Sequence, residues 1–498
     1  MRPASPGPVD QPARSDSLVK GLSEAIGGPL GEHGVRDSTG LPPRSFWQPT
    51  RVILVLICLT LSLHWVQKGP CRDGAWSDLS QYKYMCYTDV LALYYAEGLS
   101  EGKVPYQDHP VEYPVLTGAL MGVLGLPVHA IGDANPEINQ AQLFYDLNAL
   151  VLAGFGIAAV AAILAVRRRR PWDAAMFALA PALLVTATVN WDLLAVGLFA
   201  VAMLAWARSR PALAGVLLGL AVAAKFYPIL ILGPLFLLAY RTNKWKPVGV
   251  TTGLAVLTWL VVNVPVALMW PDSWLRFFRF NTERGIDWGT LWYIGAHLPT
   301  GGGGSGLPGF AALNSDSGHA QLNILYLALF ILACFGIASL VLIAPRTPRL
   351  AQLTFLVVAA FLLTGKVWSQ QYVLWLIPLA VLARPRWGAF LAWQFAELCY
   401  FAAFYGELMG ASGRQVFPEW VFVLAAGLRM GTLCLLVGYV VREILRPERD
   451  VVRASYDGGD PDCPQDFRAG LPTAALADPS YPQGGAEFPQ AATLSTGR

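Results

Sequence analysis

The residues of this sequence that could do chemistry stand in short polar segments between long apolar runs. One segment contains Asp89, His109 and Glu112. Later segments contribute a set of amides, carboxylates, cations and one tyrosine: Asn190, Asp192, Lys225, Arg284, Lys366, Gln371 and Tyr372. Carboxylates accept protons, and lysine or arginine holds anionic groups through charge-assisted hydrogen bonds. If these side chains lie close together, they would form a site that binds an anionic head group and carries out acid–base chemistry. The alternative is that they are solvated loop ends and ion pairs.

The composition places these residues in a membrane protein. Of the 498 residues, 55% are hydrophobic and 14% are charged, and the mean hydropathy is +0.45. Roughly a quarter of the residues of an ordinary soluble domain are Asp, Glu, Lys or Arg. The low fraction of charged residues therefore excludes an ordinary soluble enzyme and a disordered chain. The net charge of +3 lies in short basic clusters between apolar runs, which is not a nucleic-acid-binding pattern.

Six basic clusters predict how the chain crosses the membrane, because short cytoplasmic loops are enriched in Lys and Arg. The clusters lie at 167–170, 208–210, 241–246, 346–349, 384–386 and 442–449. If all six are cytoplasmic, an even number of crossings separates each pair. Residues 173–207, 211–240 and 350–383 then form hairpins, with outer turns at 190–192, 225–228 and 366–372. We therefore expect an all-α polytopic protein of about 12 transmembrane helices, with both termini cytoplasmic and the polar residues above on the extracytoplasmic side.

The same pattern divides the chain into three parts. Residues 1–46 and 447–498 are rich in Pro, Gly and polar residues and are predicted to be disordered cytoplasmic tails. Residues 47–446 form the transmembrane domain, with large outer loops at 68–141 and 270–320. Two stretches of the first loop are predicted to be helices. The stretch 89–100 lies in the membrane interface, and 113–131 lies in the interface or re-enters the membrane.

Two of the seven cysteines, Cys71 and Cys86, share the first outer loop. In an extracytoplasmic loop they either form a disulfide or remain free thiols. The cysteine and histidine spacing does not match a metal site. A transporter would be expected to carry ionisable groups within its spans, often in a repeated pattern, but these spans carry few charges and no evident repeat. No Walker or Rossmann nucleotide-binding motif occurs either. The interpretation that remains is a membrane enzyme acting on a lipid-borne substrate at the outer leaflet.

Several short motifs, in order, resemble one enzyme family. They are Cys86-Tyr87-Thr88-Asp89-Val90, Glu112-Tyr113-Pro114, Asn190-Trp191-Asp192, Lys225-Phe226-Tyr227-Pro228, Asp287-Trp288-Gly289 and the segment 366–372. The sequence over about residues 50–445 resembles family-87 glycosyltransferases, which are polyprenyl-phosphate-mannose-dependent enzymes of actinobacteria. The resemblance implies a GT-C-type bundle and a single essential carboxylate in the first outer loop, which matches Asp89.

Asp89 is the predicted general base, taking the proton of an acceptor hydroxyl that attacks the anomeric carbon of the sugar. The alternative is an ordinary helix-capping aspartate. Lys225, Lys366 and Arg284 are the candidates for holding the donor phosphate, although Lys225 could instead reach the head-group level by snorkelling. The candidates for binding the sugar or the acceptor are the remaining polar residues: Glu112, His109, Asp192, Asn190, Gln371 and Tyr372.

The resemblance also implies the reaction and its partners. We expect an inverting hexosyltransferase of the plasma membrane and cell envelope that moves mannose from a polyprenyl phosphate carrier. The acceptor would be a glycolipid or a surface glycan, and no cofactor, metal ion or nucleotide sugar would be required. Two alternatives stay open: a pentosyl (arabinofuranosyl-like) transferase on the same scaffold, or a non-enzymatic lipid flippase or transporter.

Overall fold

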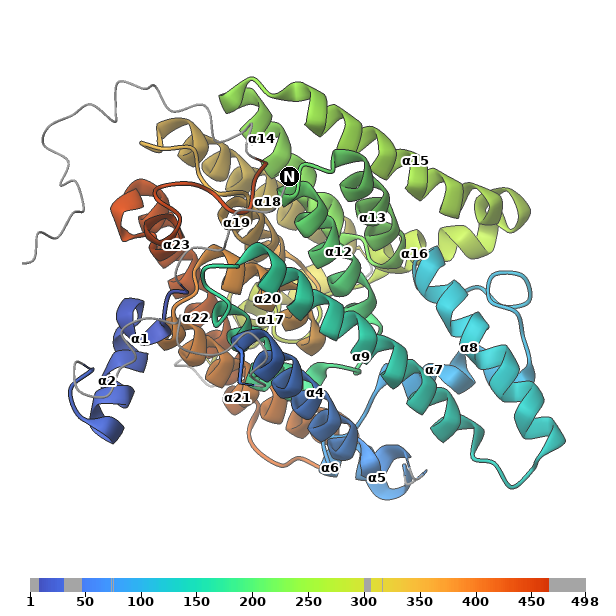
Figure 1. Cartoon of the computed structure of the whole chain (residues 1–498). Helices are drawn as coiled ribbons and strands as arrows, with labels where there is room; N and C mark the ends of the chain where they lie inside the picture. Colours follow the sequence, from blue (N-terminus) through green and yellow to red (C-terminus); the bar gives the residue numbers. More distant parts are fainter. Residues whose placement is uncertain are drawn as a thin grey trace, which may run out of the picture.

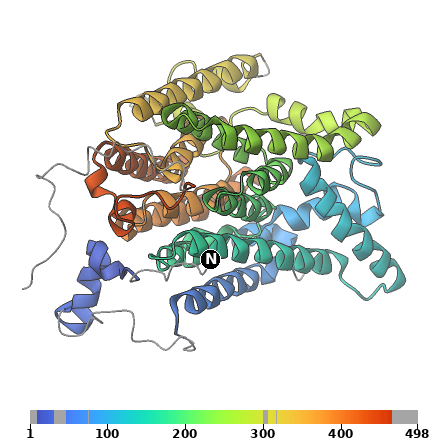
Figure 2. The same ribbon diagram turned by 45° about the horizontal axis from the view of Figure 1, so that its top comes forward.

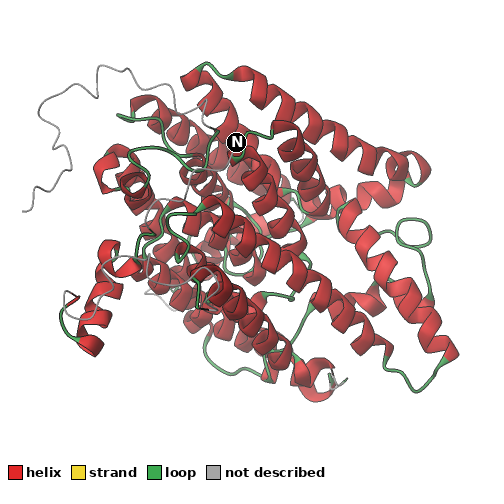
Figure 3. Cartoon of the chain, viewed as in Figure 1, coloured by secondary structure: helices red, strands yellow, loops and turns green. Residues whose placement is uncertain are grey.

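The computed structural model describes residues 9–30, 47–72, 74, 76–299, 306–315 and 317–464. Within these ranges the chain is helical and contains no β-strand (Figure 3). Among the described residues, six helices are long and apolar enough to cross a membrane: α4 (Pro49–Gln67), α8 (Val115–Ala134), α9 (Gln140–Val166), α15 (Trp245–Met269), α18 (His319–Ile343) and α22 (Glu419–Leu445). The all-helical fold with several candidate spans agrees with the prediction, whereas the total of about 12 spans stays a prediction.

Six shorter apolar segments complete the predicted hairpins. They comprise α10 (Asp173–Ala178) with α11 (Pro181–Thr186), α12 (Asp192–Ala207), α13 (Pro211–Ala224), η4 (Tyr227–Ile231) with α14 (Leu232–Thr242), α19 (Leu350–Thr364), and η6 (Gln370–Tyr372) with α20 (Val373–Ala383). The helices break at the predicted turns. At one of them Lys225 is extended, with φ −154° and ψ 140°, and Pro228 lies in the first turn of the next helix, η4. A proline at the first turn of a helix loses no intrahelical hydrogen bond.

Small residues let the central helices approach closely. A Cβ atom on Gly215 would lie 2.5 Å from the Thr251 carbonyl oxygen, and one on Gly219 would lie 2.5 Å from that of Ala255. This Gly-xxx-Gly spacing therefore permits the contact between α13 and α15. Figures 1 and 2 show α4 and α9 side by side along another part of the bundle.

Shorter elements fill the two large loops. The first loop contains α5 (Gly69–Arg72), η2 (Ser77–Leu79), α6 (Ser80–Lys83), α7 (Asp89–Ala96) and η3 (Leu99–Glu101), followed by α8. The second contains α16 (Pro271–Glu283), α17 (Leu291–His297) and η5 (Ala311–Asn314). Both helices predicted in the first loop are present as α7 and α8. Because α8 is also long enough to span, its interfacial position stays a prediction.

The basic clusters gather at one end of the bundle. There Arg208 donates to the Ala165 carbonyl oxygen, 2.9 Å away, and Arg349 donates to the carbonyl oxygens of Leu382 and Ala383. Arg384 pairs with Glu443 at 3.0 Å, near the start of α21 (Trp387–Ala411). α12 begins at Asp192 and ends next to Arg208, so the turns that carry the candidate site residues lie at the other end.

Parts of the segments predicted to be disordered tails, residues 9–30 and 447–464, contain helices in the structure. The first stretch forms α1 (Pro12–Ser15) and α2 (Ser17–Gly27), and the second forms η7 (Pro447–Arg449) and α23 (Val451–Ser455). Acidic residues of these segments neutralise buried arginines of the bundle: Asp10 pairs with Arg170, and Asp462 pairs with both Arg167 and Arg349. The polar composition of the tails concealed these partners. Residues 1–8, 31–46 and 465–498 lie outside the described residues.

Candidate active site

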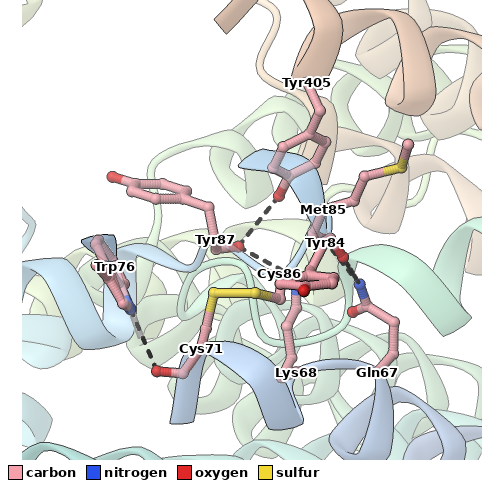
Figure 4. Close-up of a disulfide and its surroundings, with 9 residues drawn as sticks. All are labelled: Gln67, Lys68, Cys71, Trp76, Tyr84, Met85, Cys86, Tyr87 and Tyr405. Carbon is pink, nitrogen blue, oxygen red and sulfur yellow. Dashed lines mark hydrogen bonds between the residues drawn. A yellow bond between two sulfur atoms is a disulfide. The ribbon is translucent and has the colours of Figure 1, made fainter. Parts of the chain in front are cut away.

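The segment before Asp89 is held from several sides (Figure 4). A disulfide joins Cys71 of α5 to Cys86. The Tyr87 carbonyl oxygen accepts two hydrogen bonds, one from Lys68 Nζ at 3.1 Å and one from the Tyr405 hydroxyl at 3.2 Å. The loop is therefore tied both to the end of α4 and to α21.

Asp89 begins α7 and is fixed to the turn before α12. Its backbone N–H donates to the Val189 carbonyl oxygen at 2.8 Å. The preceding residue, Thr88, is the N-cap: its hydroxyl oxygen accepts from the Val90 N–H and its hydroxyl donates to the Thr188 carbonyl oxygen. A carboxylate in the first turn is stabilised by the helix dipole. The sequence-based alternative of a capping aspartate does not apply, because Thr88 supplies the cap.

The Asp89 carboxylate is hydrogen-bonded and partly exposed. Asn190 Nδ2 donates to its Oδ2 at 3.0 Å, and the Tyr87 hydroxyl also donates to it. Burial raises the pKa of Asp89 to about 6, opposed by these two hydrogen bonds and by the charge of Lys225, and reinforced by Glu112. Near pH 7 the group is thus ionised, yet it is a stronger base than an aspartate of ordinary pKa.

Lys225 lies beside Asp89 and faces two aromatic rings. Its ammonium is 3.4 Å from the fully buried Asp192 carboxylate and 5.4 and 5.5 Å from the ring centroids of Tyr113 and Tyr372. Asp192 also accepts a hydrogen bond of 2.6 Å from the indole N–H of Trp375. These contacts place the ammonium within the site, so it does not reach away from the bundle by snorkelling.

Asn190 links the base to the cation. Its side-chain amide donates to the Tyr113 hydroxyl at 2.6 Å as well as to Asp89. The Tyr113 ring then faces the Lys225 ammonium. The predicted residues Asp89, Asn190, Asp192, Lys225 and Tyr372 therefore form one contiguous cluster.

Arg284 joins this cluster from the segment after α16. Its guanidinium is 3.6 Å from the Asp287 carboxylate, and it interacts electrostatically with Tyr372, Glu112 and Tyr113. A second cation, Arg284, and two further carboxylates, Asp287 and Glu112, thereby border the cluster. Gln371 is buried beside Tyr372 in η6.

Lys366 occupies a different position from that of the other cations. Its buried ammonium donates to the carbonyl oxygens of Thr282 and Arg284, at 3.1 and 2.5 Å. Burial and the charge of Arg284 lower the pKa of Lys366 to about 8. In this structure Lys366 supports the backbone that carries Arg284.

His109 lies in a neighbouring acidic group rather than in contact with Asp89. Its Nε2 is 3.3 Å from the buried Glu97 carboxylate, and Glu97 accepts a hydrogen bond from the Glu112 backbone. Burial, reinforced by the Glu112 charge, raises the pKa of Glu97 to about 7. Glu112 is the residue that connects this group to the cluster around Asp89.

The sequence analysis missed a buried ion pair that supports the site. Arg429 of α22 is 2.9 Å from Glu397 of α21 and donates to the carbonyl oxygens of Trp368 and Ser369. It therefore holds the segment that follows Lys366. A lone arginine within the apolar run 418–441 was the available signal, because isolated charges inside membrane segments are costly.

Among the described residues, no group of three or more His, Cys, Asp or Glu side chains is arranged to hold a metal ion. What the arrangement offers is a base with a raised pKa beside two cations, with tyrosines and amides around them.

A model of glycosyltransferase family 87 matches residues 113–369, just over half of the chain. The chain belongs to this family. It is thus a multi-pass membrane glycosyltransferase, and the family-87 match contains Asn190, Asp192, Lys225, Arg284 and Lys366. Asp89, His109 and Glu112 precede the match, and Gln371 and Tyr372 follow it. No curated protein matches the chain.

Proposed function

We propose that this glycosyltransferase moves a hexose, specifically mannose, from a polyprenyl phosphate carrier to an extracytoplasmic glycolipid or glycan. The observation that carries the proposal is the short chain of contacts from Asp89 through Asn190 and Tyr113 to Lys225. It brings a base and a cation to one site, as attack on a phosphate-linked sugar requires.

In the proposed reaction Asp89 takes the proton of an acceptor hydroxyl. The oxygen forms a bond to the anomeric carbon while the bond from that carbon to the phosphate oxygen breaks, and the lipid phosphate leaves with the electron pair. Because the phosphate is a stable anion, no second carboxyl is needed to protonate it, unlike the leaving alkoxide in a glycosidase. A single displacement inverts the anomeric configuration, so a β-linked donor yields an α-linked product.

The leaving phosphate would be held by Lys225 and Arg284. Each is already close to one carboxylate, Asp192 and Asp287 respectively, which fixes its position before the donor binds. Cations placed in advance where charge develops stabilise a transition state without reorganisation. Lys366 would act indirectly, through the backbone of Arg284.

An apolar cavity beside Lys225 supports the proposal that the sugar donor is lipid-linked. It has a volume of about 270 Å³ and lies between α13, η4 and α15, with Phe226, the residue after Lys225, in its wall. The cavity is also lined by Leu218, Val222 and Trp259. An isoprenoid chain in this cavity would bring its phosphate towards the Lys225 ammonium.

Two observations support an extracytoplasmic site. The Cys71–Cys86 disulfide lies just before Asp89, and disulfides persist in oxidising compartments. The basic clusters lie at the other end of the bundle, where the positive-inside rule places the cytoplasm. Both termini would then be cytoplasmic, since the described terminal segments pair with the arginines of that end.

The test is transfer of labelled mannose from polyprenyl-phosphate-mannose by the purified protein beside its Asp89→Asn variant. We expect product from the wild type, and a loss of about 10³-fold in kcat with retained donor binding in the variant. Polyprenyl-phosphate-arabinofuranose is assayed in parallel. If product forms only from the pentose donor, the transferred sugar is arabinofuranose rather than mannose. If the wild type and Asp89→Asn turn over equally, Asp89 is not the general base.

A further inference from the structure

A basic pocket lies at the end of the bundle opposite the candidate active site. It has a volume of about 330 Å³, within the range of roughly 300–1,000 Å³ typical of ligand pockets. The C-terminal ends of α9 and α12 and the segment that follows α23 form its wall. The residues of the wall that carry the argument are Val166, Arg168, Arg208, Ser209 and Tyr456.

Arg168 differs from its neighbours in the run of four arginines at 167–170. The other three form ion pairs with carboxylates, namely Arg167–Asp462, Arg169–Asp457 and Arg170–Asp173. Arg168 is exposed and forms no ion pair with any of the described residues. The wall of the pocket therefore contains the one cation of this run whose charge is not neutralised by a described carboxylate.

Two further arginines add to this charge. Arg208 donates to the Ala165 carbonyl oxygen at 2.9 Å. It also interacts electrostatically with Arg168 and Arg210. No carboxylate in the described part of the chain pairs with Arg208 or Arg210. Because like charges repel one another, an anion bound between these arginines would be held by all three.

Ser209 adds a hydrogen-bonding group between two of the arginines. It has φ 58°, a left-handed conformation that glycine adopts more readily and that usually belongs to glycine directly after a helix. Serine supplies a hydroxyl there, and this hydroxyl has no hydrogen-bond partner among the residues that the structure describes. Guanidinium and hydroxyl groups both donate to phosphate oxygens, so the wall offers charge and donors for a phosphate ester.

The apolar part of the wall indicates that this phosphate belongs to a lipid. Val166 and Ala207 line the pocket and are the last residues of α9 and α12. α9 is long and apolar enough to cross a membrane, so its end lies near the level of the lipid head groups. Basic pockets between helices on the cytoplasmic side bind anionic head groups in other membrane proteins.

We propose that this pocket binds the phosphate of an anionic phospholipid from the cytoplasmic leaflet. Arg168 and Arg208 hold the phosphate, and the Ser209 hydroxyl donates a further hydrogen bond. Tyr456, in the same wall, accepts a hydrogen bond from the Arg169 backbone N–H at 3.0 Å, so the bound lipid also contacts the C-terminal segment. The inference uses the membrane orientation proposed above and is independent of the transferred sugar.

The binding test uses the purified full-length protein in an uncharged detergent, where the surface potential of a membrane is absent. Native mass spectrometry measures the affinity for dioleoyl-phosphatidylglycerol, which is anionic, and for dioleoyl-phosphatidylcholine, which is zwitterionic. We expect the wild type to bind the anionic lipid about tenfold more tightly or better. Arg168→Gln combined with Arg208→Gln should weaken that binding about 100-fold, because two charge-assisted hydrogen bonds are lost.

Arg442→Gln combined with Arg446→Gln is the matched control. These two arginines lie at the C-terminal end of α22, at the same end of the bundle, and are exposed and without an ion pair among the described residues. Neither belongs to the wall of the pocket. The control should bind phosphatidylglycerol as the wild type does. Equal weakening in both double variants would overturn the pocket, because any cation at this end would then be sufficient.

Two further measurements complete the test. Glycerophosphoglycerol, the same head group without acyl chains, should not displace the lipid, and displacement at the affinity of the lipid would assign the pocket to a soluble phosphate ester instead. Phosphatidylglycerol should raise the melting temperature of the wild type but not that of the Arg168/Arg208 double variant. A wild type that binds both lipids equally would contradict the proposal whatever the variants do.

These measurements do not require turnover. A protein that binds phosphatidylglycerol selectively but transfers no sugar would refute the proposed function and leave the pocket intact. A protein that transfers mannose without selecting the anionic lipid would refute the pocket alone.

Discussion

The side-chain amide of Asn190 donates a hydrogen bond of 3.0 Å to the carboxylate of Asp89, a residue 101 positions earlier in the chain. The same amide donates to the Tyr113 hydroxyl, whose ring faces Lys225. One side chain therefore orients the candidate base and connects it to the candidate phosphate-binding cation. The following predictions depend on this arrangement.

The pH dependence of kcat/KM is expected to follow the ionisation of Asp89. Because the base must be deprotonated, activity should fall about tenfold per unit below a pH near 6, the pKa of this carboxyl group. The Tyr87 hydrogen bond lowers that pKa and the Glu112 charge raises it. Tyr87→Phe should therefore move the acid limb to higher pH, and Glu112→Gln should move it to lower pH. Shifts in one common direction would refute the assignment.

Lys225→Met is expected to lower kcat by about 100-fold, because the leaving phosphate loses a cation. It also leaves the buried Asp192 carboxylate without its partner, which should cost about 3 kcal/mol of stability. Lys225→Met combined with Asp192→Asn removes that unpaired charge, and should recover the melting temperature but not the turnover. Recovery of both would make Lys225 a structural residue.

Arg429 is expected to act as a positioning residue. Replacing Arg429 and Glu397 together by leucine removes the buried pair without leaving a lone charge, so the protein should still fold. The carbonyl groups of Trp368 and Ser369 lose their donor, and the segment that carries Lys366 becomes less fixed. We expect a KM for the donor raised several-fold, with the pH profile unchanged. A shifted pH profile would instead indicate contact with the reacting groups.

Loss of the Cys71–Cys86 disulfide is expected to weaken both the fold and the site. The bond closes a loop of sequence separation 15, for which chain entropy predicts about 3 kcal/mol. Thermal unfolding of Cys71→Ser with and without reductant, beside the wild type treated in the same way, measures this effect. The wild type should lose stability on reduction, whereas the variant should not respond.

The folded part of the C-terminal segment is expected to stabilise the bundle. Asp462 is buried between Arg167 and Arg349, so Asp462→Asn should lower stability by about 3 kcal/mol without changing the turnover of the folded protein. Asp457, 83% exposed and paired with Arg169, is the matched control. Asp457→Asn should change stability by less than about 1 kcal/mol, as for other surface pairs. Equal effects would show that the buried network does not contribute.

Part of the candidate site could be predicted from the sequence because single charges interrupt apolar runs. Asp192 and Lys225 stand at helix breaks in the structure as the positive-inside rule predicted. Lys366 shows the limit of this reasoning, since its charge suggested a phosphate ligand but its ammonium is bound by two backbone carbonyl groups. Tyr113 shows the opposite error: it was noted as part of the Glu112-Tyr113-Pro114 motif, but an uncharged ring gave no sign of its place between Asn190 and Lys225.

The sequence by itself determined the membrane class and the positions of the helix breaks, because these depend on composition and charge within short windows of the chain. Asp89 was chosen from the resemblance of the surrounding motifs to those of family 87. Only the tertiary structure decided which polar groups meet. The bond from Asn190 to Asp89, the pair of Lys225 with Asp192 and the pair of Asp462 with Arg349 join residues that are distant in sequence. Such contacts are set by how the helices pack and by the need to pair each buried charge, which no local pattern records.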